Sequence, residues 1–236
     1  MSAKVTVDRA RTASFDVDAQ NTFTPVCPDE LPVAGGTEIV PELNAMARLA
    51  SLRLGSKDAH SPKAVWVADA DNPPLSPLTG HANADIRWPV HAVPGTKGFE
   101  LIDGLPPVES YDFFVWKGVE PHMHPYGACY HDLANRMSTG VIEFLRDRGI
   151  DTVLVGGLAT DYCVKNTALQ LREAGFRVVL NLAACRGVAP DTTAQAIEAM
   201  RAAGVILVES AAEIQDRKST RLNSSHKTES RMPSSA

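Results

Sequence analysis

Short apolar segments alternate with amphipathic segments along most of this 236-residue chain, and this alternation strongly restricts its fold. Strands and helices at this spacing are typical of βαβ crossovers, which build a parallel sheet covered by helices. We therefore predict an α/β fold in three layers, with a mostly parallel central sheet and helices on both faces. The predicted strands are residues 12–18, 111–117, 151–155, 177–182 and 205–208, and the predicted helices are residues 38–54, 136–148, 191–203 and one that begins near residue 160.

The last segment, residues 217–236 (RKSTRLNSSHKTESRMPSSA), differs in composition from the rest of the chain. It is rich in Ser, Lys and Arg and has no hydrophobic periodicity, so it cannot bury enough apolar surface to become ordered. It resembles translated vector sequence more than the natural end of a protein, although a genuine disordered tail is the alternative. We predict one domain over residues 1–216 and a disordered, non-native tail over residues 217–236.

Composition limits the partners and the compartment. A net charge of −5 and a pI near 5.8 argue against nucleic acid or an anionic membrane as the main partner. No apolar run approaches the ~20 residues that span a bilayer. The four cysteines are scattered and form no CxxC pair, which indicates reduced thiols in the cytoplasm. We expect a small-molecule substrate and leave homo-oligomerisation open.

The segment Val155–Val164 (VGGLATDYCV) carries the strongest chemical signal. Its two glycines predict a sharp turn between a strand and a helix, and Thr160 or Asp161 is expected to cap that helix. Cys163 would then lie in the first helical turn, where unpaired N–H groups and the helix dipole favour a thiolate. This is the setting of a nucleophile; the alternative is a buried, inert cysteine.

We expect two charged residues at the same edge of the sheet as this cysteine. Asp18 and Lys117 each end a predicted strand, and the carboxyl ends of parallel strands meet at one edge of a sheet. A carboxylate beside a thiol can accept its proton and return it to a leaving amine. An ammonium there would keep Asp18 ionised and favour the Cys163 thiolate. Taken singly, Asp18 could be a turn residue and Lys117 a solvated strand end.

A second constellation suggests a metal site. Asp58 and His60 are two residues apart, so in an extended segment their side chains point the same way. His91 follows in the sequence WPVH, where Pro89 stiffens the chain. One carboxylate and two imidazoles suit Zn²⁺, Fe²⁺ or Mn²⁺ and leave positions open for water or substrate. Histidines are more often structural than metal-binding, which is the alternative for each residue.

Other candidate ligands are weaker. His81 and Asp85 lie between the two halves of this constellation and are possible additional ligands. His122 and His124 could also bind a metal, but their position beside Pro121 and Pro125 favours a loop that covers the site.

Four sequence blocks, in this order, resemble the nicotinamidase/pyrazinamidase branch of the isochorismatase-like cysteine hydrolases. The blocks are VDAQNTF (17–23), KDAH (57–60) with WPVH (88–91), WKG (116–118) and GLATDYCV (157–164), and they span most of residues 12–215. The resemblance implies a catalytic triad of Asp18, Lys117 and Cys163. It also implies that the metal ligands are Asp58, His60 and His91. Within the superfamily, the combination of the Asp58-x-His60 motif with the WPVH motif (88–91) points to nicotinamidase.

The same resemblance implies further site residues. The backbone N–H groups of Ala159 and Cys163 would form an oxyanion hole, with a cis peptide between Leu158 and Ala159. Phe23 and Trp88 match positions that pack against the two faces of a pyridine ring. The loop over residues 119–130 departs from the family pattern, and we expect it to line the pocket, with Tyr126 as a substrate-binding candidate.

Two other departures concern the surroundings of these residues. Thr22 stands where many relatives carry Asp, which predicts different hydrogen bonding next to the site. The insertion between His60 and His91 is long and Pro-rich, and it could change the number of metal ligands.

The implied activity is that of a hydrolase acting on a linear carboxamide C–N bond. Nicotinamide would be hydrolysed to nicotinate and ammonia through a cysteine thioester, with one divalent transition metal positioning the pyridine ring. Zinc is the first candidate for that metal, followed by iron and manganese. The alternative is a metal-free cysteine amidohydrolase for another small amide, and a protein that only binds its ligand would require a blocked pocket.

Overall fold

Six parallel strands form the central sheet of the computed structural model, which describes residues 4–217. Their order across the sheet is β4-β3-β2-β5-β6-β7, and every pairing is parallel. This arrangement confirms the predicted α/β class. The strands are β2 (Thr12–Val17), β3 (Leu52–Asp58), β4 (Phe113–Lys117), β5 (Thr152–Leu158), β6 (Arg177–Arg186) and β7 (Ile206–Val208).

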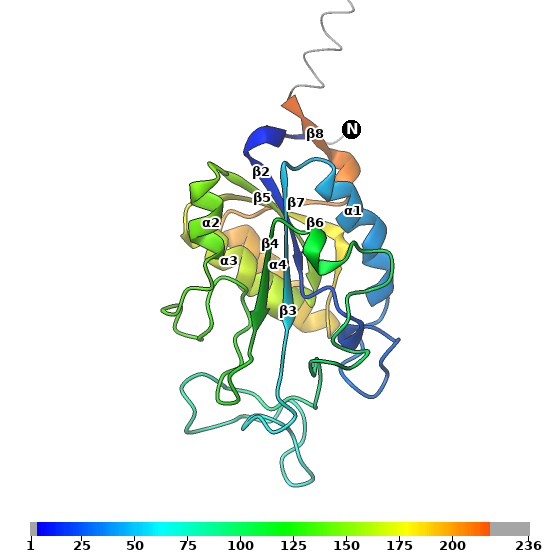
Figure 1. Ribbon diagram of the computed structural model, residues 1–236, viewed down its shortest axis with the longest axis vertical. Helices are drawn as coiled ribbons and strands as arrows, with labels where there is room; N and C mark the ends of the chain where they lie inside the picture. The colour runs from blue at the N-terminus through cyan, green and yellow to red at the C-terminus, as the bar shows by residue number, and fades with distance from the viewer. Residues whose placement is uncertain (1–3, 218–236) are drawn as a thin grey trace, which may run out of the picture.

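Helices cover both faces of this sheet, as predicted. The helix α1 (Val40–Ala47) lies on one face, and α2 (Val141–Asp147), α3 (Lys165–Glu173) and α4 (Pro190–Ala202) lie on the other (Figure 1). The short strands β1 (Val5–Val7) and β8 (Ile214–Asp216) pair with each other in a separate parallel sheet. The remaining helical turns are η1 (Arg9–Arg11), η2 (Asn21–Phe23), η3 (Gly36–Ile39), η4 (Val108–Ser110), η5 (Thr160–Val164) and η6 (Ala211–Glu213).

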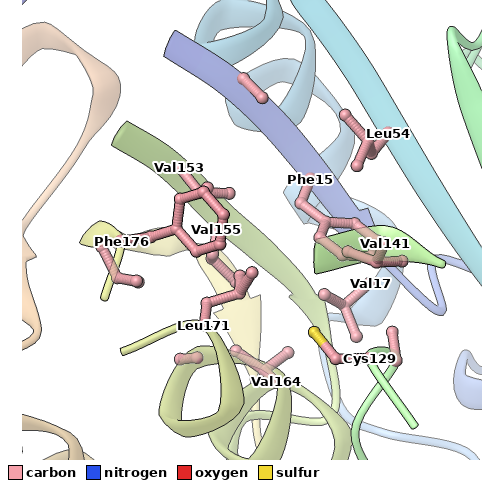
Figure 2. Packing of buried hydrophobic residues seen from close by; sticks show 14 of the residues in the cluster. Phe15, Val17, Leu54, Cys129, Val141, Val153, Val155, Val164, Leu171 and Phe176 are labelled. Atoms are coloured by element: carbon pink, nitrogen blue, oxygen red, sulfur yellow. The ribbon is translucent and has the colours of Figure 1, made fainter. Parts of the chain in front are cut away.

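The alternation of side chains along β5 creates two apolar cores. Val153 and Val155 point to the α3 face, where they pack with Phe15, Leu171 and other buried side chains (Figure 2). Leu154 points to the opposite face and packs in the cluster that contains residues of α1. Because β5 is buried on both faces, it reads in sequence as a continuous apolar run, which is typical of a parallel sheet.

Two predicted helix boundaries are wrong. The predicted helix over residues 38–54 ends at Ala47, and the second half of that segment enters β3, a strand that the sequence pattern did not predict. Short apolar runs do not distinguish a buried strand from a helix by periodicity, which is the reason for the error. The predicted helix over residues 136–148 begins only at Val141, because Gly140 has a left-handed backbone with φ 89°.

The two glycines of the Cys163 segment do not form the predicted turn. Gly156 and Gly157 lie within β5, and the strand register shifts between Val155 and Gly157. At Gly157, φ is 138°, and an added Cβ would lie 1.9 Å from the carbonyl oxygen of Val17. The close approach of β2 therefore requires a glycine here.

A long segment between β3 and β4, residues 59–112, extends from the carboxyl edge of the sheet (Figure 1). It contains η4 and isolated bridges such as Val67–Trp88, but no strand. This segment carries Trp88 and His91 back toward the strand ends. Within residues 4–217, no helix combines the length and apolar character that crossing a bilayer requires. Apart from Arg217, the predicted tail over residues 217–236 lies outside the described residues.

Candidate active site

The three residues predicted to form a triad meet at the carboxyl edge of the sheet. Asp18 directly follows β2, Lys117 is the last residue of β4, and Cys163 lies in the π-helical turn η5 after β5. The Lys117 Nζ atom is 2.9 Å from Asp18 Oδ2 and 3.6 Å from Cys163 Sγ. All three side chains are buried. Parallel strand register brings together residues that are up to 145 positions apart in sequence (163 − 18).

Lys117 also connects this cluster to the predicted metal ligands. Its Nζ donates a short hydrogen bond to Asp58 Oδ1 and a bond of 3.2 Å to the carbonyl oxygen of Pro125. The other oxygen of Asp18, Oδ1, accepts a hydrogen bond of 2.6 Å from the Ser56 hydroxyl. One ammonium therefore lies between two carboxylates, and Ser56 fixes the orientation of one of them.

The two carboxylates differ in how readily they bind a proton. Burial raises the pKa of Asp18, and Lys117 only partly opposes that effect. Burial also acts on Asp58, but Lys117 and His60 outweigh it and hold the Asp58 pKa well below its usual range. For Lys117, the two carboxylates outweigh burial and hold the pKa well above its usual value. Asp58 and Lys117 thus form the ion pair, and Asp18 is the group suited to exchange a proton.

Cys163 is a neutral thiol at rest, which differs from the predicted thiolate. Burial raises the pKa of this thiol well above its usual value; Lys117 opposes that effect, while Asp18 adds to it. The predicted capping is also wrong, because no side chain caps η5. The Asp161 carboxylate instead accepts hydrogen bonds from the backbone N–H groups of Val188 (3.0 Å) and Ala189 (3.3 Å), at the start of α4.

The predicted metal ligands also lie together. His60 Nε2 is 3.4 Å from Asp58 Oδ1. The Nδ1 atoms of His60 and His91 lie 3.1 Å and 2.7 Å from the carbonyl oxygens of Gly118 and Pro89. Because a carbonyl only accepts hydrogen bonds, each Nδ1 must carry a proton, and Nε2 is the ring atom that each residue can offer to a metal. His60 Nε2 is buried and has no hydrogen-bond partner among the described residues.

The sequence analysis did not place His124 in this group. Ligand atoms of His60, His91 and His124 lie within 4.8 Å of one another, and all three residues are buried. Burial lowers the pKa of His91 to about 3 and that of His124 well below its usual range, so both rings are neutral. A buried cluster of three imidazoles beside a carboxylate fits a divalent transition metal. The signal that could have found His124 was its place in the loop directly after Lys117.

The weaker candidates do not join the cluster. His81 and Asp85 are exposed, and Asp85 accepts a hydrogen bond of 2.7 Å from the Tyr126 hydroxyl. His122 is also exposed, on the same loop as His124.

A pocket lies between the thiol and the imidazoles. Trp88 meets Tyr162 edge to face at 4.9 Å, and Tyr162 is a lining residue that the sequence analysis missed. The peptide bond between Leu158 and Ala159 is cis, as the resemblance implied. The predicted substrate-binding and oxyanion-hole residues that line the pocket are Phe23, Trp88, Tyr126, Ala159 and Cys163.

Thr22, which departs from the family pattern, has an acidic partner elsewhere in the chain. Its hydroxyl donates a short hydrogen bond to Glu30 Oε2. Both groups then accept the backbone N–H of Ala92, at 3.1 Å from Thr22 Oγ1 and 2.9 Å from Glu30 Oε2. A hydroxyl and a distant carboxylate together hold the residue that follows His91.

Comparison with known proteins identifies the class that this fold and this site define. The model of the isochorismatase domain matches residues 12–212, and the chain belongs to that family. It is 34% identical over 197 residues to the nicotinamidase/pyrazinamidase of Mycobacterium tuberculosis, covering 81% of this chain and 95% of the relative.

Two solved structures share the fold at comparable identity. The nicotinamidase/pyrazinamidase of Acinetobacter baumannii superposes with a TM-score of 0.78 at 28% identity, over 86% of this chain and 98% of that one. The pyrazinamidase of Pyrococcus horikoshii in complex with zinc gives a TM-score of 0.67 at 27% identity, over 84% and 98%.

Proposed function

We propose that this protein is a nicotinamidase, a hydrolase that converts nicotinamide to nicotinate and ammonia. The observation that carries the proposal is a single pocket with a buried thiol at one end and buried imidazoles at the other. The thiol end suits attack on a carboxamide, and the imidazole end suits recognition of a ring nitrogen through a metal. The activities named for the relatives, nicotinamidase and pyrazinamidase, support the same conclusion.

The first half of the reaction begins with a neutral thiol. Asp18 accepts the proton of Cys163 while the sulfur attacks the carboxamide carbon, so that the anionic thiolate never accumulates in the buried site. The raised pKa of Asp18 makes it a stronger base than an ordinary aspartate. Lys117 stays charged beside both groups, 2.9 Å from Asp18, and holds them in position.

The tetrahedral intermediate then collapses to a thioester. The N–H groups of Ala159 and Cys163 stabilise its oxyanion, and one such donor is commonly worth ~10²–10³ in rate. Asp18 donates the proton to the departing nitrogen, which leaves as ammonia. Asp18 next takes a proton from water, the hydroxyl attacks the thioester carbon, and the proton returns to the sulfur of Cys163.

The other end of the pocket selects the substrate ring. Asp58, His60 and His91 would hold one divalent transition metal, with zinc the first candidate. When bound, the metal would supply a Lewis-acidic position for a ring nitrogen. Phe23, Trp88 and Tyr126 provide apolar surface around that ring.

One observation favours a second candidate, a metal-free amidase for another small amide. The Asp58 carboxylate already has a cationic partner, Lys117, so it does not require a metal to be satisfied. His60 and His91 would then be structural residues of the pocket wall.

The deciding measurement compares nicotinamide with benzamide, which carries the same carboxamide but no ring nitrogen. We expect about one transition metal per chain and a large nicotinamide/benzamide ratio of kcat/KM in the natural enzyme. His91→Ala should lose the metal and collapse the ratio, whereas exposed His81→Ala should leave both unchanged. A protein without metal, or an unchanged ratio in His91→Ala, would favour the metal-free amidase.

The proposal extends to the setting of the enzyme. All four cysteines are unpaired, which supports a reducing compartment such as the cytoplasm. The expected partner is the small-molecule amide.

A further inference from the structure

No hydrogen bond among the described residues explains why the imidazole of His124 is buried. Its side chain is 3% exposed, and neither ring nitrogen has a hydrogen-bond partner within residues 4–217. Burying a polar group without a partner costs free energy, and most buried side-chain nitrogens in proteins are paired. Two unpaired nitrogens on one buried ring therefore call for a ligand.

The neighbours of this ring indicate which ligand. Ligand atoms of His124, His60 and His91 lie within 4.8 Å of one another. Two nitrogens bound to one tetrahedral zinc ion lie ~3.3 Å apart, because Zn–N bonds are about 2.0–2.1 Å long. The His124 ring is nearly parallel to that of His60, with centroids 4.9 Å apart and an interplanar angle of 19°. Metal binding would therefore draw these ring nitrogens closer together by side-chain rotation.

The backbone on each side of His124 is anchored. Its own N–H donates to the carbonyl of Asn83 at 2.7 Å, and the indole N–H of Trp66 donates to the carbonyl of Met123 at 3.0 Å. On the other side, the Pro125 carbonyl accepts from Lys117 at 3.2 Å. These bonds fix the backbone at His124 and so keep its ring next to His60, as a preorganised metal site requires.

Aromatic packing alone does not account for this residue. The ring meets Trp66 edge to face at 4.5 Å and lies nearly parallel to Trp88 at 5.7 Å. A phenylalanine would make similar contacts without burying two polar nitrogens. The two ring nitrogens of the imidazole therefore need an explanation other than packing.

We propose that His124 is a third imidazole ligand of the divalent transition metal, supplied by the loop that follows β4. This inference rests on the proposed function, which places that metal at His60 and His91. A metal bound to His124 would also fix the position of the loop that carries Tyr126. Metal binding would then affect the shape of the pocket wall.

The test uses metal-free full-length protein, Co²⁺ as the metal, and affinity and visible absorption as the readouts. His124→Ala should bind Co²⁺ at least ~10-fold more weakly than the natural protein, with altered ligand-field bands. His122→Ala is the matched control, because His122 is exposed on the same loop. It should match the natural protein in both affinity and spectrum. Unchanged Co²⁺ affinity and absorption in His124→Ala would overturn the inference.

A second measurement needs no variant and so does not depend on whether His124→Ala folds. With ¹¹³Cd²⁺ bound to the natural protein, proton–cadmium correlation spectra should show the ring protons of three histidines. Two histidines would overturn the inference while leaving the metal of the proposed function intact. A natural protein that binds neither Co²⁺ nor Cd²⁺ would instead contradict the metal-dependent function itself.

Discussion

The thiol end of the pocket is built on strands, whereas the imidazole end depends largely on loops. Asp18 and Lys117 lie at the ends of β2 and β4, and the register pairs Asp58 with Lys117 directly. His91 and His124 lie on irregular segments, which isolated bridges, hydrogen bonds and aromatic packing hold in place. The residues proposed for the chemistry thus lie on the sheet, and those proposed for recognition lie on segments that can vary without disrupting the sheet.

Because of this difference, substitutions at the two ends of the pocket should have different kinetic effects. Changes at the strand ends should lower kcat for every amide, because the same atoms react in each case. Changes on the loops should alter which amide is preferred, because they act on the ring and not on the carboxamide. The following predictions test that division, from the largest expected effect to the smallest.

Cys163→Ala should lower kcat by at least ~10⁴-fold, because no other group can form the thioester. Nicotinamide and benzamide should lose activity equally, and metal content should not change. Steady-state ammonia release measures the effect. Cys129→Ala is the control, since that thiol is buried in the apolar core away from the pocket. Substantial turnover in Cys163→Ala would exclude the proposed nucleophile.

Asp18→Asn should lower kcat by about 10²–10⁴-fold, because the amide keeps the shape but cannot take up a proton. Removing only the hydroxyl that orients Asp18, in Ser56→Ala, should reduce kcat much less. Single-turnover kinetics would show whether thioester formation is the step that slows. Near-normal turnover in Asp18→Asn would assign the base to another residue.

The pH profile of kcat/KM should carry the signature of Asp18. Burial raises the pKa of this carboxyl above the usual 3.8, so the group becomes protonated at a higher pH than an ordinary aspartate. Activity requires the ionised form and should fall as the pH decreases through that raised pKa. The charge on Lys117 should persist at alkaline pH, since its pKa lies well above 10.5. An acid limb at or below 3.8, in protein that circular dichroism shows to be folded, would contradict this assignment.

Asp161→Ala should have the smallest effect, which is a loss of stability. Asp161 anchors the helical turn that carries Cys163. The Asp161 carboxylate accepts two backbone N–H groups and the Thr192 hydroxyl at 2.6 Å, which ties η5 to the start of α4. Its loss should cost about 1–3 kcal/mol of unfolding free energy. The melting temperature should fall by roughly 2–4 °C per kcal/mol, as calorimetry can measure. Asp191→Ala, exposed in the first turn of α4, should melt within about 2 °C of the natural protein. Equal melting temperatures for the two variants would show that this connection is dispensable.

Much of the thiol end of the pocket could be predicted from the sequence. The strands before Asp18 and Lys117 are apolar runs of recognisable length, and parallel topology places their ends at one edge. Strand β3 was missed, because a buried central strand and an apolar helix look alike over a few residues. The thiolate prediction failed for a related reason. Cys163 is 5% exposed beside two carboxylates, and neither its burial nor those neighbours is encoded in its own segment.

The sequence by itself determined the α/β class, the residues with the chemistry of a nucleophile, an acid–base group and a cation, and three metal-ligand candidates. Local patterns and strand ends carry that information, since each depends on neighbours along the chain. Only the tertiary structure decided that His124 joins His60 and His91, and that Asp161 supports α4 instead of its own helix. Those partners are distant in sequence and meet on loops, where no period or register constrains the position. Hydrogen bonds between loops, such as that from His124 to Asn83, set their geometry.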